Sequence, residues 1–355
     1  MPVPTSPIPV AVLGATGAVG QTFIRLLDGH PWFRVAEVAA SERSAGQRYD
    51  AATRWIEGVM PASVADLTVV ACRPDAVRSP IVFSALDSGV AGEIEAAFAG
   101  AGRLVLSNAK NYRMDPDVPL VIPEVNADHL GLLETQRARR GWSGGIVTNA
   151  NCAATVAAMA LAPVHAAFGV ERVFVTTMQA VSGAGYPGVP SLDILGNVIP
   201  YIGDEEPKIE REMNKMLGRL EAGRIAEAPF TVSAHANRVP TMNGHMTCLS
   251  IAFEKPVTAE EVHEALSGWE GHAICRGLPS APSVPLRVMA EPDRPQTRRD
   301  VDAGRGMTVS VGRIRPDPLF HVKFVALGHN TIRGAAGGSI LNAEVLVAQG
   351  AVPLA

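Results

Sequence analysis

One short segment near the start of the chain constrains the fold more than any other. Residues 8–27 read IPVAVLGATGAVGQTFIRLL, a β-branched apolar run followed by Gly14, Gly17 and Gly20 and then by apolar residues at helical spacing. Such a run suits a buried parallel strand, and the glycines allow a tight turn before a helix. This order is the setting in which a glycine-rich turn binds a dinucleotide pyrophosphate. We expect a Rossmann-type domain here, with a plain strand–turn–helix as the alternative.

The loop after the second expected strand bears on the choice of cofactor. Residues 34–40 form that strand, and Ser41, Glu42, Arg43 and Ser44 follow it. NAD-specific folds place a carboxylate here for the ribose hydroxyl, whereas hydroxyls and a guanidinium suit a 2′-phosphate. The loop therefore favours NADP. Glu42 opposes this interpretation if it points inward, and a solvated polar loop is the alternative.

Strand-like and helical segments alternate along the rest of the chain. Those before residue 150 predict a parallel sheet, and they are 67–72, 81–85, 103–107, 118–122 and 145–149. The later strands predict a mixed sheet in an α+β domain, and they are 173–181, 247–254, 307–314 and 321–327. Residues 294–306 are expected to form a surface loop and residues 339–349 a closing helix. The predicted fold class is α/β, with a Rossmann-type N-terminal domain and a second α+β domain.

Composition excludes several kinds of protein. The 355 residues include 31 basic and 35 acidic side chains, a net charge of -4, which lacks the basic surplus that nucleic-acid binding needs. The four cysteines are scattered and form no CxxC pair, so neither a disulfide scaffold nor a metal site is expected. No signal peptide and no apolar stretch of about 18 residues is present, so no membrane association is expected. A cytoplasmic protein that binds a small molecule is the expectation.

Cys152 is the residue best placed for chemistry. It follows the expected strand 145–149 and precedes the Ala-rich helical segment 153–167. Unpaired N–H groups and the dipole at a helix start stabilise a thiolate. In a dinucleotide-binding protein, thiol attack on a carbonyl carbon prepares hydride transfer. An inert core cysteine is the alternative for Cys152, and Cys72, Cys248 and Cys275 are expected to be structural.

A cysteine nucleophile needs an acid–base partner, and His245 is the favoured histidine. It lies in a turn that leads into a strand, seven residues after Arg238, which could hold a substrate carboxylate with two hydrogen bonds. His329 is a competitor. His165 and His263 lie on expected helical faces, and the residues alone leave this choice open.

Several segments along nearly the whole chain, from residues 14–20 to residues 329–334, form a specific set of motifs. The most specific are SERSAG (41–46), SNA (107–109), NANC (149–152), QAVSGAG (179–185), RVPTMNGH (238–245) and EPDRPQ (291–296). In these motifs the chain resembles a known family, the aspartate-β-semialdehyde dehydrogenases, and within it the archaeal and fungal branch rather than the common bacterial one.

The resemblance implies roles for individual residues. Cys152 is expected to be the nucleophile, His245 the general acid/base, and Gln179 a group that orients the substrate or the acyl intermediate. The expected substrate ligands are Arg238 (α-carboxylate), Glu205 (ammonium), Lys208 and Arg113 (phosphate), Asn108 and Asn151. The expected cofactor ligands are Gly14, Thr16, Gly17, Ala18, Val19, Ser41, Arg43, Ser44, Ser84, Ser182, Gly183 and Asn330. A solvated charge cluster at 205–208 and a surface Arg113 are the alternatives.

The activity implied by the resemblance is the reversible, NADPH-dependent reduction of aspartyl phosphate to aspartate semialdehyde and phosphate through a thioacyl group on Cys152. Such enzymes serve the biosynthesis of lysine and diaminopimelate, threonine and methionine. The implied assembly is a homodimer or homotetramer. The implied domains are an NADP-binding domain at 1–150, which the returning helix at 335–355 joins, and a catalytic and dimerisation domain at 151–334.

The chain departs from the family pattern around the proposed nucleophile. Ala150 stands where Pro is common, and Ala153 and Ala154 stand where Ser and Thr are usual; Asp204 and Pro207 also differ from the frequent residues. Loss of the hydroxyls is expected to alter hydrogen bonding at the thiol. The closest rival is malonyl-CoA reductase on the same scaffold, which has no need of an ammonium ligand at Glu205. N-acetylglutamyl-phosphate reductase and a non-catalytic dinucleotide sensor are further alternatives.

Overall fold

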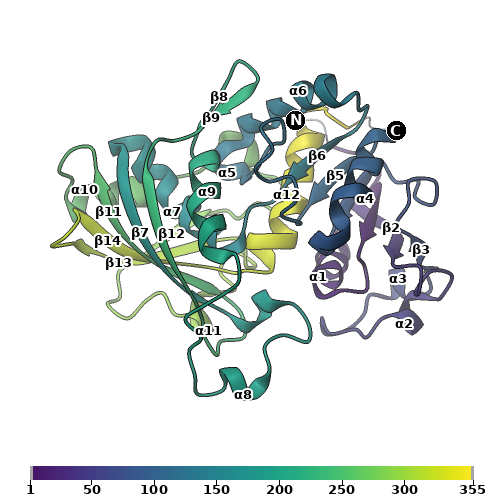
Figure 1. Ribbon diagram of the computed structural model, residues 1–355, viewed down its shortest axis with the longest axis horizontal. Coiled ribbons are helices and arrows are strands. Elements are labelled where there is room, and N and C mark those ends of the chain that lie inside the picture. The colour runs from purple at the N-terminus through teal and green to yellow at the C-terminus, as the bar shows by residue number, and fades with distance from the viewer. Residues whose placement is uncertain (1–2, 353–355) are drawn as a thin grey trace.

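Two six-stranded sheets organise the computed structural model, which describes residues 3–352 (Figure 1). The first sheet is parallel throughout, in the order β3-β2-β1-β4-β5-β6. Its strands are β1 (Ile8–Leu13), β2 (Phe33–Ala40), β3 (Val70–Ala71), β4 (Ile81–Ser84), β5 (Leu104–Ser107) and β6 (Gly145–Thr148). The chain reverses its direction of winding between β1 and β4, and folds of this kind bind ligands beyond the carboxyl ends of the strands at that point. The predicted Rossmann-type half is confirmed.

Helices cover both faces of this sheet, because its central strands are apolar on both sides. Every residue of β4, β5 and β6 is buried. The helices of this half are α1 (Ala18–Leu27), α2 (Tyr49–Ala52), α3 (Ala62–Ala65), α4 (Ser88–Gly100), α5 (Pro123–Asn126) and α6 (Leu132–Arg140). A 3₁₀ turn, Ala127–Gly131, links α5 to α6.

Two expected strands of this half were wrong in whole or in part. Only Val70–Ala71 of the segment 67–72 pairs in the sheet. The segment 118–122 is not a strand, and only Leu120 forms an isolated bridge, to Thr148. Here the Asn126 side chain bonds the carbonyl of Leu120 and the amide of Ile122, so these groups are satisfied without a ladder.

The second sheet is mixed, in the order β10-β7-β11-β14-β13-β12, as predicted for this half. Its strands are β7 (Val170–Gln179), β10 (Thr231–Arg238), β11 (His245–Phe253), β12 (Leu286–Met289), β13 (Val309–Pro316) and β14 (Val322–Gly328). Its helices are α7 (Cys152–Phe168), α9 (Glu205–Met216) and α10 (Ala259–Ser267), and they pack with the sheet in one apolar core. The sequence did not predict β10 and β12, because β10 alternates small and polar residues and β12 has only four residues.

Shorter elements complete the described chain. They are α8 (Ser191–Ile194), α11 (Thr297–Asp300), the hairpin β8 (Arg219–Glu221) and β9 (Arg224–Ala226), and 3₁₀ turns at Val181–Ala184 and Ala273–Cys275. α11 places one helical turn inside the segment 294–306 that was expected to be a loop. None of the helices within residues 3–352 combines the length and the apolar character that a membrane crossing requires.

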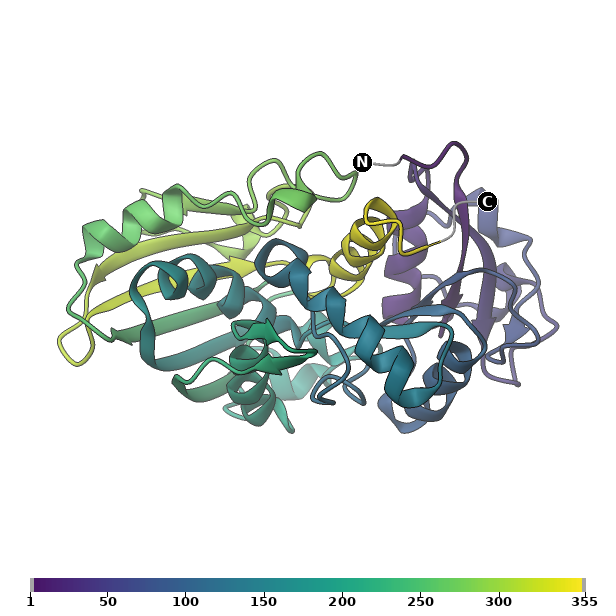
Figure 2. The same cartoon turned by 90° about the horizontal axis from the view of Figure 1, so that it is seen from above.

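The C-terminal helix α12 (Gly337–Ala348) lies between the two sheets and joins the core of the first (Figures 1 and 2). Each of its residues is buried. A π-helical turn, Ile332–Ala336, precedes it. Within that turn the buried Arg333 makes two hydrogen bonds to the Glu124 carboxylate, at 2.8 and 2.5 Å. This ion pair ties the turn before α12 to α5.

Candidate active site

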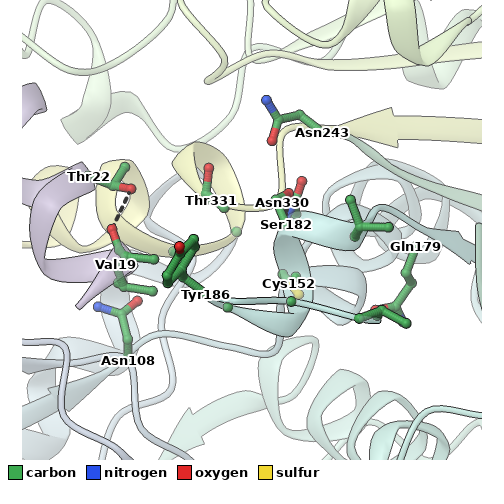
Figure 3. Close-up of a pocket in the computed structure, with 18 of the residues that line it drawn as sticks. Val19, Thr22, Asn108, Cys152, Gln179, Ser182, Tyr186, Asn243, Asn330 and Thr331 are labelled. Atoms are coloured by element: carbon green, nitrogen blue, oxygen red, sulfur yellow. Dashed lines mark hydrogen bonds between the residues drawn. The ribbon is translucent and has the colours of Figure 1, made fainter. Parts of the chain in front are cut away.

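A cavity of about 1110 Å³ opens between the two halves of the molecule. Its walls include the segments that follow β4, β5 and β6, so it lies at the carboxyl ends of the first sheet. Figure 3 shows Val19, Thr22 and Asn108 from the first half on one side and Gln179 from the second half on the other, with Cys152 between them. The cavity therefore occupies the place where an open α/β sheet binds its ligands.

The thiol of Cys152 lines this cavity at the first residue of α7. Asn151 caps the helix, because its Oδ1 accepts the amide N–H groups of Ala153 and Ala154 at 3.0 Å each. Burial and the Glu205 carboxylate raise the pKa of the Cys152 thiol to about 12, and nearby Arg113 and Arg238 oppose this rise. The group is therefore a thiol at neutral pH.

The turn before α12 fixes the other side of Cys152. A Cβ on Gly334 would lie 2.7 Å from the Cys152 Cβ, so no side chain fits there. Ala153 and Ala154 are fully buried in the second core and do not line the cavity. Their side chains therefore face the core and not the thiol, and the expected change in hydrogen bonding at the thiol does not follow from them. Ala150 does line the cavity.

Three adjacent strands bring Gln179, Arg238 and His245 to one end of the second sheet. Gln179 and Arg238 end the parallel strands β7 and β10 and are direct register partners. His245 begins β11, which runs antiparallel on the other side of β7. Residues 66 positions apart in the chain thus meet only because of this strand order.

His245 is fully buried beside the cavity wall. Its Nδ1 accepts the Ala180 N–H at 3.1 Å, so the proton of the neutral ring resides on Nε2. No group within residues 3–352 hydrogen-bonds to Nε2. Burial and the charge of Arg238 lower the pKa of His245 to about 3. The ring is therefore neutral, and its Nε2–H donor has no acceptor in the described part of the chain.

Gly183 separates this histidine from the cavity. A Cβ on Gly183 would lie 3.0 Å from His245 Nε2 and 2.9 Å from Arg238 Nη1, and Gly183 itself lines the cavity. Of the other histidines considered, His329 lines the cavity, whereas His165 and His263 do not. A side chain at position 183 would therefore collide with both His245 and Arg238.

The charged wall of the cavity combines three elements. Arg113 follows β5, Glu205 and Lys208 lie on the first turn of α9, and Arg238 ends β10. Glu205 accepts the Asn151 side-chain N–H at 2.8 Å and lies 3.5 Å from Lys208 Nζ. Arg238 donates one N–H to the Ala180 carbonyl at 2.8 Å. Two cations, one carboxylate and a further guanidinium fork therefore surround the thiol.

The glycine turn has the shape that a dinucleotide needs. A Cβ on Gly14 would lie 2.6 Å from the Ala85 carbonyl oxygen, and one on Gly20 would lie 2.3 Å from the Gly14 carbonyl oxygen. Gly17 caps α1 without a side-chain bond, so the first-turn N–H groups are not used by a capping side chain. Ala18 and Val19 line the cavity. Gly14, Thr16 and Gly17 shape the turn without lining the cavity.

The other expected cofactor ligands divide into two groups. Ser182, Gly183 and Asn330 line the cavity, and Asn330 Nδ2 donates to Ser182 Oγ at 2.8 Å. Ser41, Arg43 and Ser44 form a turn after β2 beyond the cavity wall. Glu42 lies 3.6 Å from the Arg73 guanidinium, which partly balances its charge.

The side chain of Ser84, an expected cofactor ligand, lies inside the first half of the molecule. Its hydroxyl is fully buried, does not line the cavity, and donates to Glu95 Oε1 at 2.6 Å. Ser107 donates to the same oxygen at 2.7 Å. The side chain of Ser84 is thus engaged inside the first half.

Sequence reasoning missed Glu212, which accepts from both Arg113 and the backbone of Asn151. The signal that could have found it is its spacing: it lies seven residues after Glu205, on the same face of α9. Tyr186 was also missed. It lines the cavity, and the Arg54 guanidinium stacks over the Tyr186 ring, 5.3 Å from the ring centre.

No group of three His, Cys, Asp or Glu side chains in residues 3–352 is arranged to hold a metal ion.

A dinucleotide turn, a cysteine at a helix start and a buried neutral histidine around one cavity define a nicotinamide-dependent oxidoreductase. The chain belongs to the semialdehyde dehydrogenase family: the NAD-binding domain of that family matches residues 9–133, and its dimerisation domain matches residues 161–333.

Relatives and solved structures agree with this membership over nearly the whole chain. Aspartate-semialdehyde dehydrogenase of Archaeoglobus fulgidus is 49% identical over 339 residues, which cover 95% of this chain and 97% of the relative. The structure of the Candida albicans aspartate semialdehyde dehydrogenase with NADP matches at 43% identity and a TM-score of 0.90, over 98% of this chain and 100% of that one. The Vibrio cholerae aspartate semialdehyde dehydrogenase II complexed with ASA matches at 27% identity and a TM-score of 0.75, covering 97% and 99%. The predicted archaeal and fungal resemblance is confirmed.

Proposed function

We propose that the protein is an NADP-dependent aspartate-semialdehyde dehydrogenase that works through a thioacyl group on Cys152. The observation that carries this proposal is the cavity itself, which surrounds one thiol with a neutral histidine and a set of charges of both signs. The names of the archaeal and fungal relatives support the choice of substrate.

The charges around the thiol complement aspartyl phosphate group by group. Arg238 binds the α-carboxylate through its fork, and Glu205 binds the ammonium. Arg113 and Lys208 bind the phosphate, and Asn108 and Asn151 are further substrate ligands. Malonyl-CoA has no ammonium, so the buried Glu205 favours the amino acid over that rival.

The cofactor binds along the glycine turn and reaches the thiol. The N–H groups at the start of α1 hold the pyrophosphate, with Gly14, Thr16, Gly17, Ala18 and Val19 forming the turn. Ser182, Gly183 and Asn330 border the nicotinamide, and Ser41, Arg43 and Ser44 hold the 2′-phosphate. When bound, NADPH supplies the hydride of the reaction.

Substrate binding itself activates the nucleophile. The Glu205 carboxylate raises the pKa of Cys152, and an ammonium paired with that carboxylate offsets this effect. The sulfur then bonds to the acyl carbon while the carbon–oxygen bond to phosphate breaks, and the thiol proton leaves with the departing phosphate as hydrogen phosphate. Gln179 orients the thioester that results. Bound NADPH would supply the hydride to this carbon. His245, the proposed general acid/base, donates a hydrogen bond from its Nε2–H to the oxygen atom. The sulfur–carbon bond then breaks, the carbonyl re-forms, and the sulfur leaves as a thiolate that takes up a proton from solvent.

The test uses initial rates with purified protein. We expect NADP⁺ reduction with aspartate semialdehyde and inorganic phosphate, and little with NAD⁺. Turnover of malonyl-CoA with NADPH, in the absence of activity with aspartate semialdehyde, would overturn the assignment. If neither substrate reacts although NADP⁺ binds, the non-catalytic sensor is the correct interpretation.

We further propose the domain division 1–150 with 335–355, and 151–334, for a cytoplasmic homodimer or homotetramer in the biosynthesis of lysine and diaminopimelate, threonine and methionine. The matched dimerisation domain supports self-association of the second half. Light scattering after size-exclusion chromatography distinguishes the assemblies, and a monomer at micromolar concentration would overturn this part.

A further inference from the structure

One buried carboxylate touches both the phosphate-binding arginine and the peptide beside the nucleophile. Glu212 lies on α9 with only 2% of its surface exposed. Its Oε1 accepts an N–H of Arg113 at 3.0 Å, and its Oε2 accepts the backbone N–H of Asn151 at 2.5 Å. Arg113 belongs to the first half of the molecule, and Asn151 caps the helix that begins with Cys152.

We propose that Glu212 is a positioning residue that fixes Arg113 relative to the start of α7, so that an anion held by Arg113 lies against the Cys152 thiol. The proposal rests on the proposed function only in naming phosphate as that anion. It adds a residue that acts through two others and does not itself line the cavity.

The chemistry of the two contacts requires a carboxylate. Both partners of Glu212 are N–H donors, and a carboxylate offers an acceptor oxygen to each. A glutamine of the same shape offers one acceptor and turns its NH₂ group toward the second donor. Burial makes that mismatch costly, because water cannot replace the lost acceptor.

A second residue of α9 holds the same arginine by its main chain. The buried Lys215 donates to the carbonyl oxygens of Arg113, Asp115 and Val118 at 2.7, 2.7 and 2.8 Å. Lys215 follows Glu212 by three residues, so both lie on one helical face. α9 thus hydrogen-bonds to Arg113 at both its side chain, through Glu212, and its backbone carbonyl, through Lys215.

The remaining contacts leave Arg113 able to bind an anion. A guanidinium has five N–H donors. One is bonded to Glu212 and another to the Asn108 carbonyl at 2.8 Å, and Nε has no partner within residues 3–352. Nε is buried, but Arg113 lines the cavity, so its remaining terminal N–H groups are available to a phosphate.

The experiment measures phosphate binding without turnover. Iodoacetamide alkylates Cys152, and mass spectrometry follows the modified peptide at increasing concentrations of inorganic phosphate. We expect phosphate to slow alkylation of the native protein. In Glu212→Gln the half-protecting phosphate concentration rises about tenfold or more, because a charge-assisted bond that orients Arg113 is lost.

Two further variants separate positioning from general damage. Glu210→Gln alters a neighbouring carboxylate of α9, which accepts the Ala234 N–H at 3.1 Å. In this variant phosphate is expected to slow alkylation as it does in the native protein. In an Arg113→Ala background, Glu212→Gln is expected to add no further loss of phosphate protection. Glu212→Asp keeps two acceptor oxygens. Its half-protecting phosphate concentration is expected to lie between that of Glu212→Gln and that of the native protein.

The outcomes are distinct from those of the activity assay. Native-like protection in Glu212→Gln, or a loss additive with Arg113→Ala, would overturn the positioning role. Failure of phosphate to protect the native protein would overturn it as well. If Glu212→Gln does not fold, Glu212→Asp decides, and native-like protection in it overturns the role. Absence of turnover with aspartate semialdehyde counts against the proposed function alone, because alkylation does not need turnover.

Discussion

The two ends of the cavity are built from different parts of the polypeptide. At the proposed cofactor end, the turn expected to hold the pyrophosphate is made by backbone: Gly14 and Gly20 allow close approach, and the first turn of α1 offers its N–H groups. The substrate end is made by buried side chains, including Arg113, Glu205 and His245. A backbone site needs only a local turn, whereas a side-chain site needs distant segments to be held in register.

The difference extends to the cost of burial. Backbone N–H groups at a helix start are present in any helix, so the cofactor end buries no charge of its own. Charged groups at the substrate end must each be compensated: Glu205 by Asn151, Arg113 by Glu212, and Arg238 by the Ala180 carbonyl. The charged side chains of the proposed substrate end therefore depend on hydrogen bonds to neighbouring residues, whereas the N–H groups of the proposed cofactor end do not.

The largest expected effect separates chemistry from cofactor binding. Cys152→Ser is expected to lower kcat for NADP⁺ reduction by about a thousandfold or more, because a serine hydroxyl is a far weaker nucleophile at neutral pH. Its NADP⁺ affinity, measured by calorimetry, is expected to stay within about twofold of native, because the backbone end is untouched. Cys248→Ser is the matched control, and comparable activity loss in it would contradict the assignment of Cys152.

The second prediction targets the backbone end. Gly20→Ala places a Cβ against the Gly14 carbonyl, and we expect NADP⁺ affinity to fall about tenfold or more as the turn is displaced. Gly100→Ala is the matched control, because its Cβ would meet only the Trp142 ring, at 3.7 Å, an ordinary contact, and Gly100 does not line the cavity. Equal affinities in the two variants would show that the cofactor end does not depend on close backbone approach.

The third prediction concerns acid. The pKa of His245 is lowered to about 3 in the folded protein, so the unfolded chain takes up this proton below about pH 6.5 while the folded chain does not. The free energy of unfolding therefore falls as the pH drops through this window, by up to about 1.4 kcal/mol per pH unit from this group.

His245→Gln isolates that contribution, because His129, His165 and His329 also have lowered pKa values and remain in the variant. Urea unfolding at pH 7, 6 and 5 is expected to give a shallower pH dependence for the variant. Parallel slopes for the two proteins would mean that His245 is protonated in the folded state.

The smallest expected effect is on thiol reactivity. Glu205→Gln removes a carboxylate that raises the pKa of Cys152, so the thiolate fraction at a given pH increases. We expect iodoacetamide to alkylate Cys152 about two- to fivefold faster at pH 8, as the thiolate is the reacting form. At the same time the KM for aspartate semialdehyde is expected to rise. Slower alkylation would show that Glu205 acts on the thiol mainly through the Asn151 cap.

The sequence predicted the local features of this protein well. Residues 8–27 predicted β1 and α1, and residues 145–167 predicted β6 and α7 with Cys152 at the junction. It was wrong for 118–122, where the Asn126 side chain replaces ladder partners, and it missed β10, whose alternation of small and polar residues resembles a loop. The failures lie where tertiary contacts override a weak local pattern.

Sequence by itself determined the glycine turn, the cysteine at a helix start, and a motif set that resembles one family. These are local properties, because a turn, a cap and a strand each depend on residues that are close in the chain. The tertiary structure alone decided which distant groups meet: the order β10-β7-β11 joins Arg238, Gln179 and His245, and α9 places Glu212 between Arg113 and Asn151. Hydrogen bonds and charges act over a few ångströms in space, and no spacing in the chain encodes that distance.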